Sequence, residues 1–66
     1  MNTGKLISTR IKSARLAKGW SQKKLAEEAN LTDRTISNVE CGKGINFGTL
    51  VSIAEALDYH LMELLR

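Results

Sequence analysis

Apolar residues along this 66-residue chain recur at spacings of three and four rather than at every second position. This period is typical of helices with one buried face, and no segment shows the alternation of a half-buried strand. The pattern predicts an all-α protein, a compact bundle of about five short helices. The first covers roughly residues 4–18, with Ile7, Ile11 and Ala14 on its buried face, and Gly19 provides a left-handed helix end.

Three further helix starts share one arrangement of apolar and polar residues. A residue with a side-chain oxygen follows an apolar residue, and a second apolar residue lies four positions further on. The oxygen can accept a hydrogen bond from a free amide of the first turn, while the two apolar residues pack together. The three sets are Trp20, Ser21 and Leu25; Leu31, Thr32 and Ile36; and Ile45, Asn46 and Leu50.

The C-terminal third of the chain predicts two helices. The fourth helix covers residues 47–57, and a short fifth lies near residues 61–65, where either Asp58 or His60 could cap it. The fourth helix has its apolar face at Leu50, Ile53, Ala54 and Leu57. Candidates for either the core or a dimer contact are Leu61, Met62, Leu64 and Leu65.

The composition indicates a single folded domain over residues 1–66. Hydrophobic residues make up 42% of the chain and charged residues 26%, and there is no proline, repeat or low-complexity segment. At this length folding buries only about 60% of the surface, so a large substrate cavity is not expected. No apolar stretch approaches the roughly 20 residues that cross a bilayer, and a lone Cys41 fits a reducing compartment. We therefore expect a cytoplasmic protein with no membrane contact.

Residues suited to catalysis or metal binding are sparse. The sequence contains no nucleophile–base pair, carboxylate dyad or glycine-rich phosphate loop. His60 has no second histidine, and Cys41 has no partner at a zinc-like spacing. We expect a protein that is not an enzyme and needs no metal or cofactor.

Charge is divided unevenly along the chain. Residues 1–24 hold seven basic side chains and no acidic one, whereas residues 25–66 hold three basic and seven acidic side chains, so that the net charge is 7 + 3 − 7 = +3. A cationic first third indicates a polyanionic partner or an acidic protein surface. The alternative is that these side chains form an ordinary solvated face.

The connection between the second and third helices is unusually short. Only Ala29, Asn30 and Leu31 separate them, and asparagine tolerates the positive φ that such a turn requires. Two helices joined in this way cross steeply, as in a helix-turn-helix, and Ala26 is small enough for a close crossing.

Two ordered motifs surround this turn. The first, R-x-x-x-G-x-S-Q-x-x-L-A, covers residues 15–26, and the second, L-T-x-x-T-I-S-x-x-E-x-G-K, covers residues 31–43. Together they resemble the Xre/Cro, lambda-repressor-like DNA-binding family, and the resemblance extends over about residues 7–65. It implies a lambda-repressor-like helical domain with the helix-turn-helix over residues 21–41, and binding to double-stranded DNA.

The third helix has a polar side suited to reading DNA bases. With Ile36 facing inward, a rotation of about 100° per residue puts Arg34 and Asn38 within roughly 20° of the opposite pole, flanked by Ser37. Arginine can bind guanine and asparagine can bind adenine through two hydrogen bonds each. Asp33 could accept from cytosine N4 or simply favour the helix N-terminus. We predict that these four residues read bases.

Other residues are expected to contact phosphates and position the protein on DNA. The resemblance implies this role for Gln22 and for the loop over residues 42–44, and exposed amides at helix starts would add to it. Lys23 and Lys24 supply positive field, with a solvated surface as the alternative. The predicted phosphate-binding residues are Gln22, Lys23, Thr32, Thr35, Lys43, Gly44 and Asn46. The resemblance also pairs Arg15 with Glu40, which implies a structural ion pair rather than a DNA contact.

Three functions are compatible with this pattern. The leading interpretation is a transcriptional regulator, a repressor that binds a pseudo-palindromic operator as a homodimer, with recognition helices about 34 Å apart. The second is an antitoxin-type protein that also binds a toxin, although no segment after the fifth helix is expected to serve that purpose. The third is a protein-interaction module whose cationic end binds an acidic protein, and only preference for one duplex sequence would separate it from the first.

Overall fold

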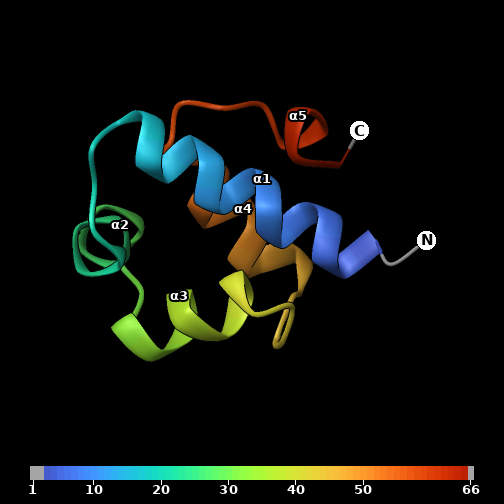
Figure 1. Ribbon diagram of the computed structural model, residues 1–66, viewed down its shortest axis with the longest axis horizontal. Coiled ribbons are helices and arrows are strands. Elements are labelled where there is room, and N and C mark those ends of the chain that lie inside the picture. Colours follow the sequence, from blue (N-terminus) through green and yellow to red (C-terminus); the bar gives the residue numbers. More distant parts are fainter. Residues whose placement is uncertain (1–2, 66) are drawn as a thin grey trace.

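Five helices and no strand make up the part of the chain that the computed structural model describes, residues 3–65 (Figure 1). The all-α prediction is confirmed. Each predicted helix is present, and the predicted ends agree with the structure to within one residue. The helices are α1 (Thr3–Ala17), α2 (Gln22–Ala29), α3 (Asp33–Glu40), α4 (Phe47–Ala56) and α5 (Leu61–Leu65).

The starts of α2, α3 and α4 have the predicted polar caps. Ser21 Oγ, Thr32 Oγ1 and Asn46 Oδ1 each accept a hydrogen bond from the backbone N–H three residues further on, at 3.0, 3.1 and 2.9 Å. The apolar residues that precede these caps pack against the core; they are Trp20, Leu31 and Ile45. Each cap satisfies an amide that the first turn of a helix leaves without a partner.

The ends of α1 to α4 share one motif. A residue with positive φ follows each helix, and the backbone N–H after it bonds back five residues to a helix carbonyl, as in the Schellman arrangement. Gly19 and Asn30 have the predicted left-handed conformation, with φ of 71° and 58°. The other two residues are Gly42 (φ 84°) and Asp58 (φ 61°).

Asp58 therefore ends α4 rather than starting α5. The short α5 begins after His60, whose backbone N–H donates to Glu63 Oε1 at 3.2 Å while the Glu63 N–H donates to the His60 carbonyl at 2.9 Å. The bond from the His60 N–H to the Glu63 carboxylate is one half of a capping box; in the other half the His60 main-chain carbonyl accepts in place of a side chain. Of the two candidates that the sequence left open, the residue before α5 is His60, and it takes part through its main chain.

A single core joins all five helices. Its side chains with at most 1% exposure include Ile11, Leu25, Ile36, Leu57 and Leu64, one from each helix or from the turn that ends it. Of the C-terminal apolar residues whose role the sequence left open, Leu64 lies in the core, Leu61 packs against it and Met62 is exposed. The side chain of Leu65 lies outside the described residues.

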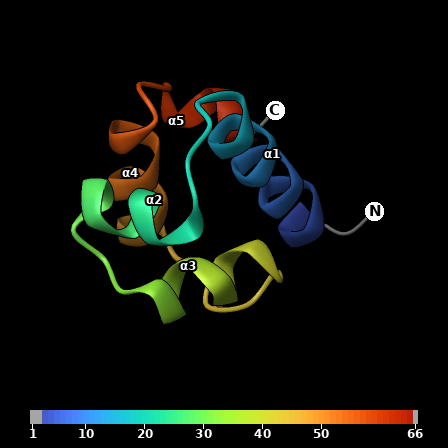
Figure 2. The same cartoon turned by 60° about the vertical axis from the view of Figure 1, so that its left-hand side comes forward.

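The packing leaves α3 at one edge of the molecule. It packs against α1 and α2, while α4 packs on α2 and α5, and α5 also contacts α1. In both Figure 1 and Figure 2, α3 lies along one edge and α5 at the opposite edge. Within residues 3–65 no helix has the length and apolar character required to cross a bilayer.

Candidate nucleic-acid interface

The two sides of α3 differ as the sequence predicted. Ile36 and Val39 are fully buried, whereas Arg34 and Asp33 are exposed. Asn38 and Ser37 are partly buried on the same outer side. The four predicted base-reading residues thus all have surface on a helix that lies at the edge of the molecule.

A pair of threonines marks the beginning of α3. Thr32 Oγ1 lies 2.9 Å from Thr35 Oγ1 and also accepts from the Thr35 N–H. Whichever hydroxyl donates to the other, the second hydroxyl keeps its own hydrogen. The pair therefore retains one O–H donor for an acceptor outside the protein, such as a phosphate oxygen.

The side-chain amide of Asn46 caps the N-terminus of α4 with its oxygen. Its Oδ1 accepts from the Thr49 N–H, so the Nδ2 group with its two hydrogens points away from the cap. The residue is exposed. A phosphate, which only accepts hydrogen bonds, fits this end of the side chain.

The loop between α3 and α4 requires two glycines. Gly42 and Gly44 have φ of 84° and 62°, where other residues are strained. Between them Lys43 is exposed, and its backbone N–H donates to the Asn38 carbonyl at 2.8 Å. The loop thus presents a lysine shortly after the end of α3.

A buried ion pair joins α1 to the end of α3. Arg15 Nε donates to Glu40 Oε2 at 2.7 Å and Arg15 Nη2 donates to Glu40 Oε1 at 3.1 Å, with side-chain exposures of 8% and 4%. A third donor, Arg15 Nη1, reaches the Trp20 carbonyl at 2.7 Å. The pairing that the resemblance implied is confirmed, and it holds the loop before α2 as well.

Gln22 takes part in the same cluster. Its Nε2 donates to Glu40 Oε1 at 3.1 Å, so this predicted phosphate-binding side chain already has one partner inside the protein. One hydrogen of its amide nitrogen remains for a second acceptor. The predicted role is compatible with this arrangement.

Comparison with protein families gives one match, and it covers most of the chain. A helix-turn-helix family model of the Xre/lambda-repressor type matches residues 11–64. The chain belongs to this family. It is thus a DNA-binding transcription regulator of the helix-turn-helix type, in a family that is generally non-enzymatic. A comparison with curated proteins finds no significant match.

The basic residues of this helix-turn-helix protein divide into two kinds. Arg15 is neutralised by Glu40, and Arg10 Nη1 donates to the Leu64 carbonyl of α5 at 3.5 Å, so both guanidinium groups serve the fold. Lys24 pairs with Glu28 at 3.2 Å. Lys23 and Lys43 are exposed. Exposed Lys23, Arg34 and Lys43 therefore place positive charge on and beside the motif.

One structural contact near the site was not predicted. Ser8 is buried, and its Oγ donates to the Val39 carbonyl, which ties α1 to the last turn of α3. A signal was present in the sequence, because Ser8 lies seven residues, or two turns, before Arg15 and so on the same side of α1. That side of α1 faces α3.

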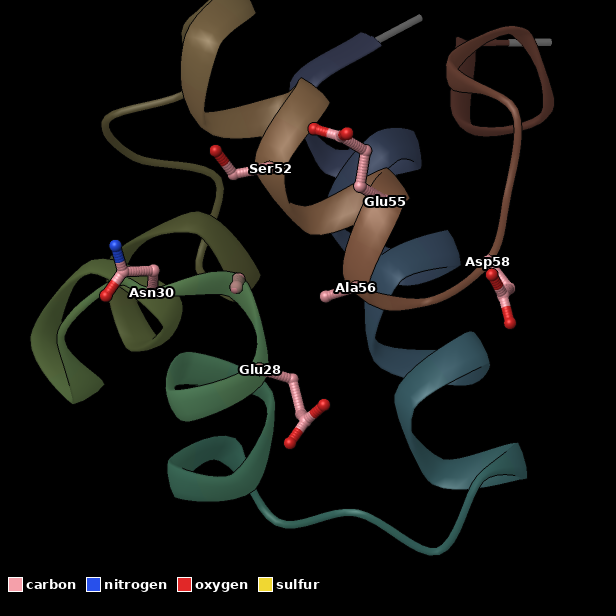
Figure 3. A pocket seen from close by; sticks show the side chains of 7 residues that line it. Glu28, Asn30, Ser52, Glu55, Ala56 and Asp58 are labelled. Carbon is pink, nitrogen blue, oxygen red and sulfur yellow. The ribbon is translucent and has the colours of Figure 1, made fainter.

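Three of the seven acidic residues line a groove on another part of the molecule. An open groove between α2 and α4 is lined by three carboxylates around a small apolar floor (Figure 3). The carboxylates of Glu28, Glu55 and Asp58 point apart rather than toward a common centre (Figure 3). Within residues 3–65 no group of histidine, cysteine or acidic side chains is arranged to hold a metal ion. This groove would repel a polyanion.

Proposed function

We propose that this protein represses transcription by binding a pseudo-palindromic operator as a homodimer, with α3 in the major groove. The observation that carries the proposal is the division of α3 between fully buried Ile36 and Val39 and the outward Arg34 and Asn38. A major-groove reader needs a rigid helix whose polar side chains face away from the core. In this proposal the protein is a cytoplasmic binding protein without a cofactor.

Arg34 and Asn38 make the specific contacts in this proposal. A guanidinium donates two hydrogen bonds to guanine O6 and N7, and a carboxamide pairs with adenine N6 and N7. Ser37 and Asp33 contact neighbouring base edges. Phosphates on either side are bound by Gln22, Lys23, Thr32, Thr35, Lys43, Gly44 and Asn46, which fix the register but carry no sequence information.

Exposed apolar side chains support the homodimer. Phe47, the first residue of α4, is 71% exposed, and Met62 in α5 is 68% exposed. These are the side chains on which we place the second protomer. We place the dimer contact on α4, α5 and the loop before α4, which leaves α3 available to DNA.

Selection of bound fragments from random-sequence duplex DNA tests this function. The proposal predicts a recovered site made of two inverted half-sites, with centres about 10 base pairs apart, or one duplex turn. Recovery of fragments with no common sequence would contradict specific recognition. A single half-site would contradict the dimer.

A further inference from the structure

Three helices meet at one carboxylate. Glu40 is the last residue of α3, Gln22 is the first residue of α2, and Arg15 comes from α1. The side chain of Glu40 is nearly fully buried, and it accepts hydrogen bonds from both of the other side chains. The Gln22 side chain is therefore hydrogen-bonded to α3 at Glu40.

The Glu40 carboxylate determines the orientation of the Gln22 side-chain amide, that is, whether its nitrogen or its oxygen faces Glu40. An ionised carboxylate only accepts hydrogen bonds, so the NH₂ group and not the amide oxygen must face Glu40. One hydrogen of Nε2 is used in that bond. Because an amide NH₂ is planar, the second hydrogen points about 120° away from the first. Gln22 is only partly buried, so part of its side chain is accessible from outside the protein.

We propose that Glu40 is a positioning residue for DNA binding, which holds the Gln22 amide so that its second N–H meets a phosphate when α3 enters the groove. The inference rests on the proposed function. The hydrogen bond sets the phosphate donor of α2 at a fixed place relative to the recognition helix. Arg15 neutralises the carboxylate, so its charge does not repel the phosphate.

The test compares Gln22→Ala, Glu40→Gln and the double variant, each binding the duplex recovered by selection and a short mixed-sequence duplex. Loss of one phosphate hydrogen bond per protomer should weaken binding by about fivefold for each protomer bound in Gln22→Ala, on both duplexes. Glu40→Gln should show a similar loss, because the NH₂ group of the introduced amide must face a donor in either orientation. It meets Arg15 Nε where Oε2 was, or Arg15 Nη2 and Gln22 Nε2 where Oε1 was, and the bonded arrangement that holds Gln22 is disturbed. The double variant should bind as the single variants do, since both remove one contact.

Ser8→Ala is the matched control. It removes a buried hydrogen bond between α1 and α3 that does not involve Gln22 or Glu40, and so destabilises the same junction. All variants are compared at a temperature at which thermal unfolding shows them to be folded. Ser8→Ala should then bind DNA within about twofold of the unsubstituted protein.

Three results would each show that Glu40 does not act through Gln22 and would overturn the inference. Glu40→Gln could bind DNA like the unsubstituted protein, or the losses in affinity could multiply in the double variant. The third result is a loss in Ser8→Ala equal to that in Glu40→Gln. In those cases the proposed function would stand. Failure of the unsubstituted protein to bind either duplex would instead overturn the proposed function, and the inference with it.

A second measurement does not depend on the folding of Glu40→Gln. The two side-chain amide protons of Gln22 are followed by NMR in the unsubstituted protein. In the free protein one proton should be shifted downfield and protected from exchange, and the mixed-sequence duplex should then shift the other. Two unprotected protons that average rapidly would contradict the inference.

Discussion

In the proposed function, several polar residues around α3 have both an internal partner and a phosphate partner for one side chain. Asn46 and Thr32 each use an oxygen to cap a helix, and Gln22 uses one amide hydrogen to reach Glu40. Asn46 and Gln22 each keep an N–H donor that a phosphate could use, and Thr32 and Thr35 keep one O–H donor between them. Within residues 3–65 no buried side-chain nitrogen or oxygen lacks a hydrogen-bond partner. In the proposed complex, internal hydrogen bonds would hold these side chains before DNA binds, which would lower the entropy lost on binding.

Asn46→Asp separates the two uses of that side chain. Aspartate keeps an oxygen for the Thr49 amide, so the free energy of unfolding should change by less than about 0.5 kcal/mol. It removes the two amide hydrogens and adds a negative charge, so binding to any duplex should weaken by at least about tenfold. Thermal unfolding and fluorescence anisotropy measure the two effects. Asn46→Ala is the control, and it should lose about 1 kcal/mol of stability as well. Unchanged DNA binding by Asn46→Asp would contradict the phosphate role.

Lys43→Ala should weaken binding to operator and random duplexes by similar factors, because a phosphate contact carries no base identity. The slope of log affinity against log salt should flatten by about one unit. Affinities for both duplexes at several salt concentrations provide the measurement. Lys24→Ala is a useful comparison, since Lys24 already pairs with Glu28. A Lys43→Ala protein that lost only operator binding would show that this lysine reads sequence.

At the scale of helices, local signals explain the agreement between sequence and structure. The starts of α2, α3 and α4 depend on a side chain and an amide three residues apart, so the sequence contains both partners. Gly19 and Asn30 were likewise predictable from their own residue types. Asp58 was not, because aspartate is common at helix starts and is tolerated in the left-handed conformation. An aspartate that starts a helix and one that ends a helix cannot be distinguished from the neighbouring residues alone.

Asp58→Gly should stabilise the end of α4. Glycine adopts the observed φ of 61° without the steric cost that other residues meet, so the free energy of unfolding should rise, by up to about 1 kcal/mol. Thermal or urea unfolding provides the measurement. Glu55→Gly, which also replaces an acidic residue of the groove but lies inside the helix, should instead lower stability by about 0.5–1 kcal/mol. A loss of stability in both variants would contradict the assigned role of Asp58.

The candidate site was predictable to different degrees. The outward side of α3 followed from the helical period, because Ile36 and Val39 had to face the core. The pair of Arg15 and Glu40 came from family resemblance, since the two residues lie far apart in the sequence. The bond between Gln22 and Glu40 depends on how α2 and α3 cross, which no local pattern specifies. Side-chain contacts between residues on different helices could not be predicted from the sequence alone.

At the scale of the whole molecule, the charges and apolar side chains leave one face suited to DNA. The α2–α4 groove is acidic, while exposed Lys23 and Lys43 lie near the ends of the helix-turn-helix. Phe47 and Met62 are exposed on α4 and α5. This distribution favours DNA on the α3 side and a second copy of the chain at the α4–α5 side.

Phe47→Ala should weaken dimer formation while leaving the fold intact, because most of the ring is already in solvent. Sedimentation in the presence of the operator should show two protomers per site for the unsubstituted protein. For Phe47→Ala the second protomer should bind only at several-fold higher concentration. Leu16→Ala removes another apolar side chain, 57% exposed on α1, and should leave the stoichiometry unchanged. One unsubstituted protomer per site at saturation would rule out the dimer.

The most direct test of the account is the base-preference profile of Arg34→Ala and Asn38→Ala, obtained by selection from random duplex DNA beside the unsubstituted protein. Each variant should lose about 1–3 kcal/mol on the preferred site and relax preference at one distinct position per half-site. Asn38→Ala, which removes no charge, should keep its affinity for random DNA. Ile36→Ala, a core change, should instead lose about 2–5 kcal/mol of stability. Unchanged profiles for both folded variants would mean that the outer side of α3 does not read bases.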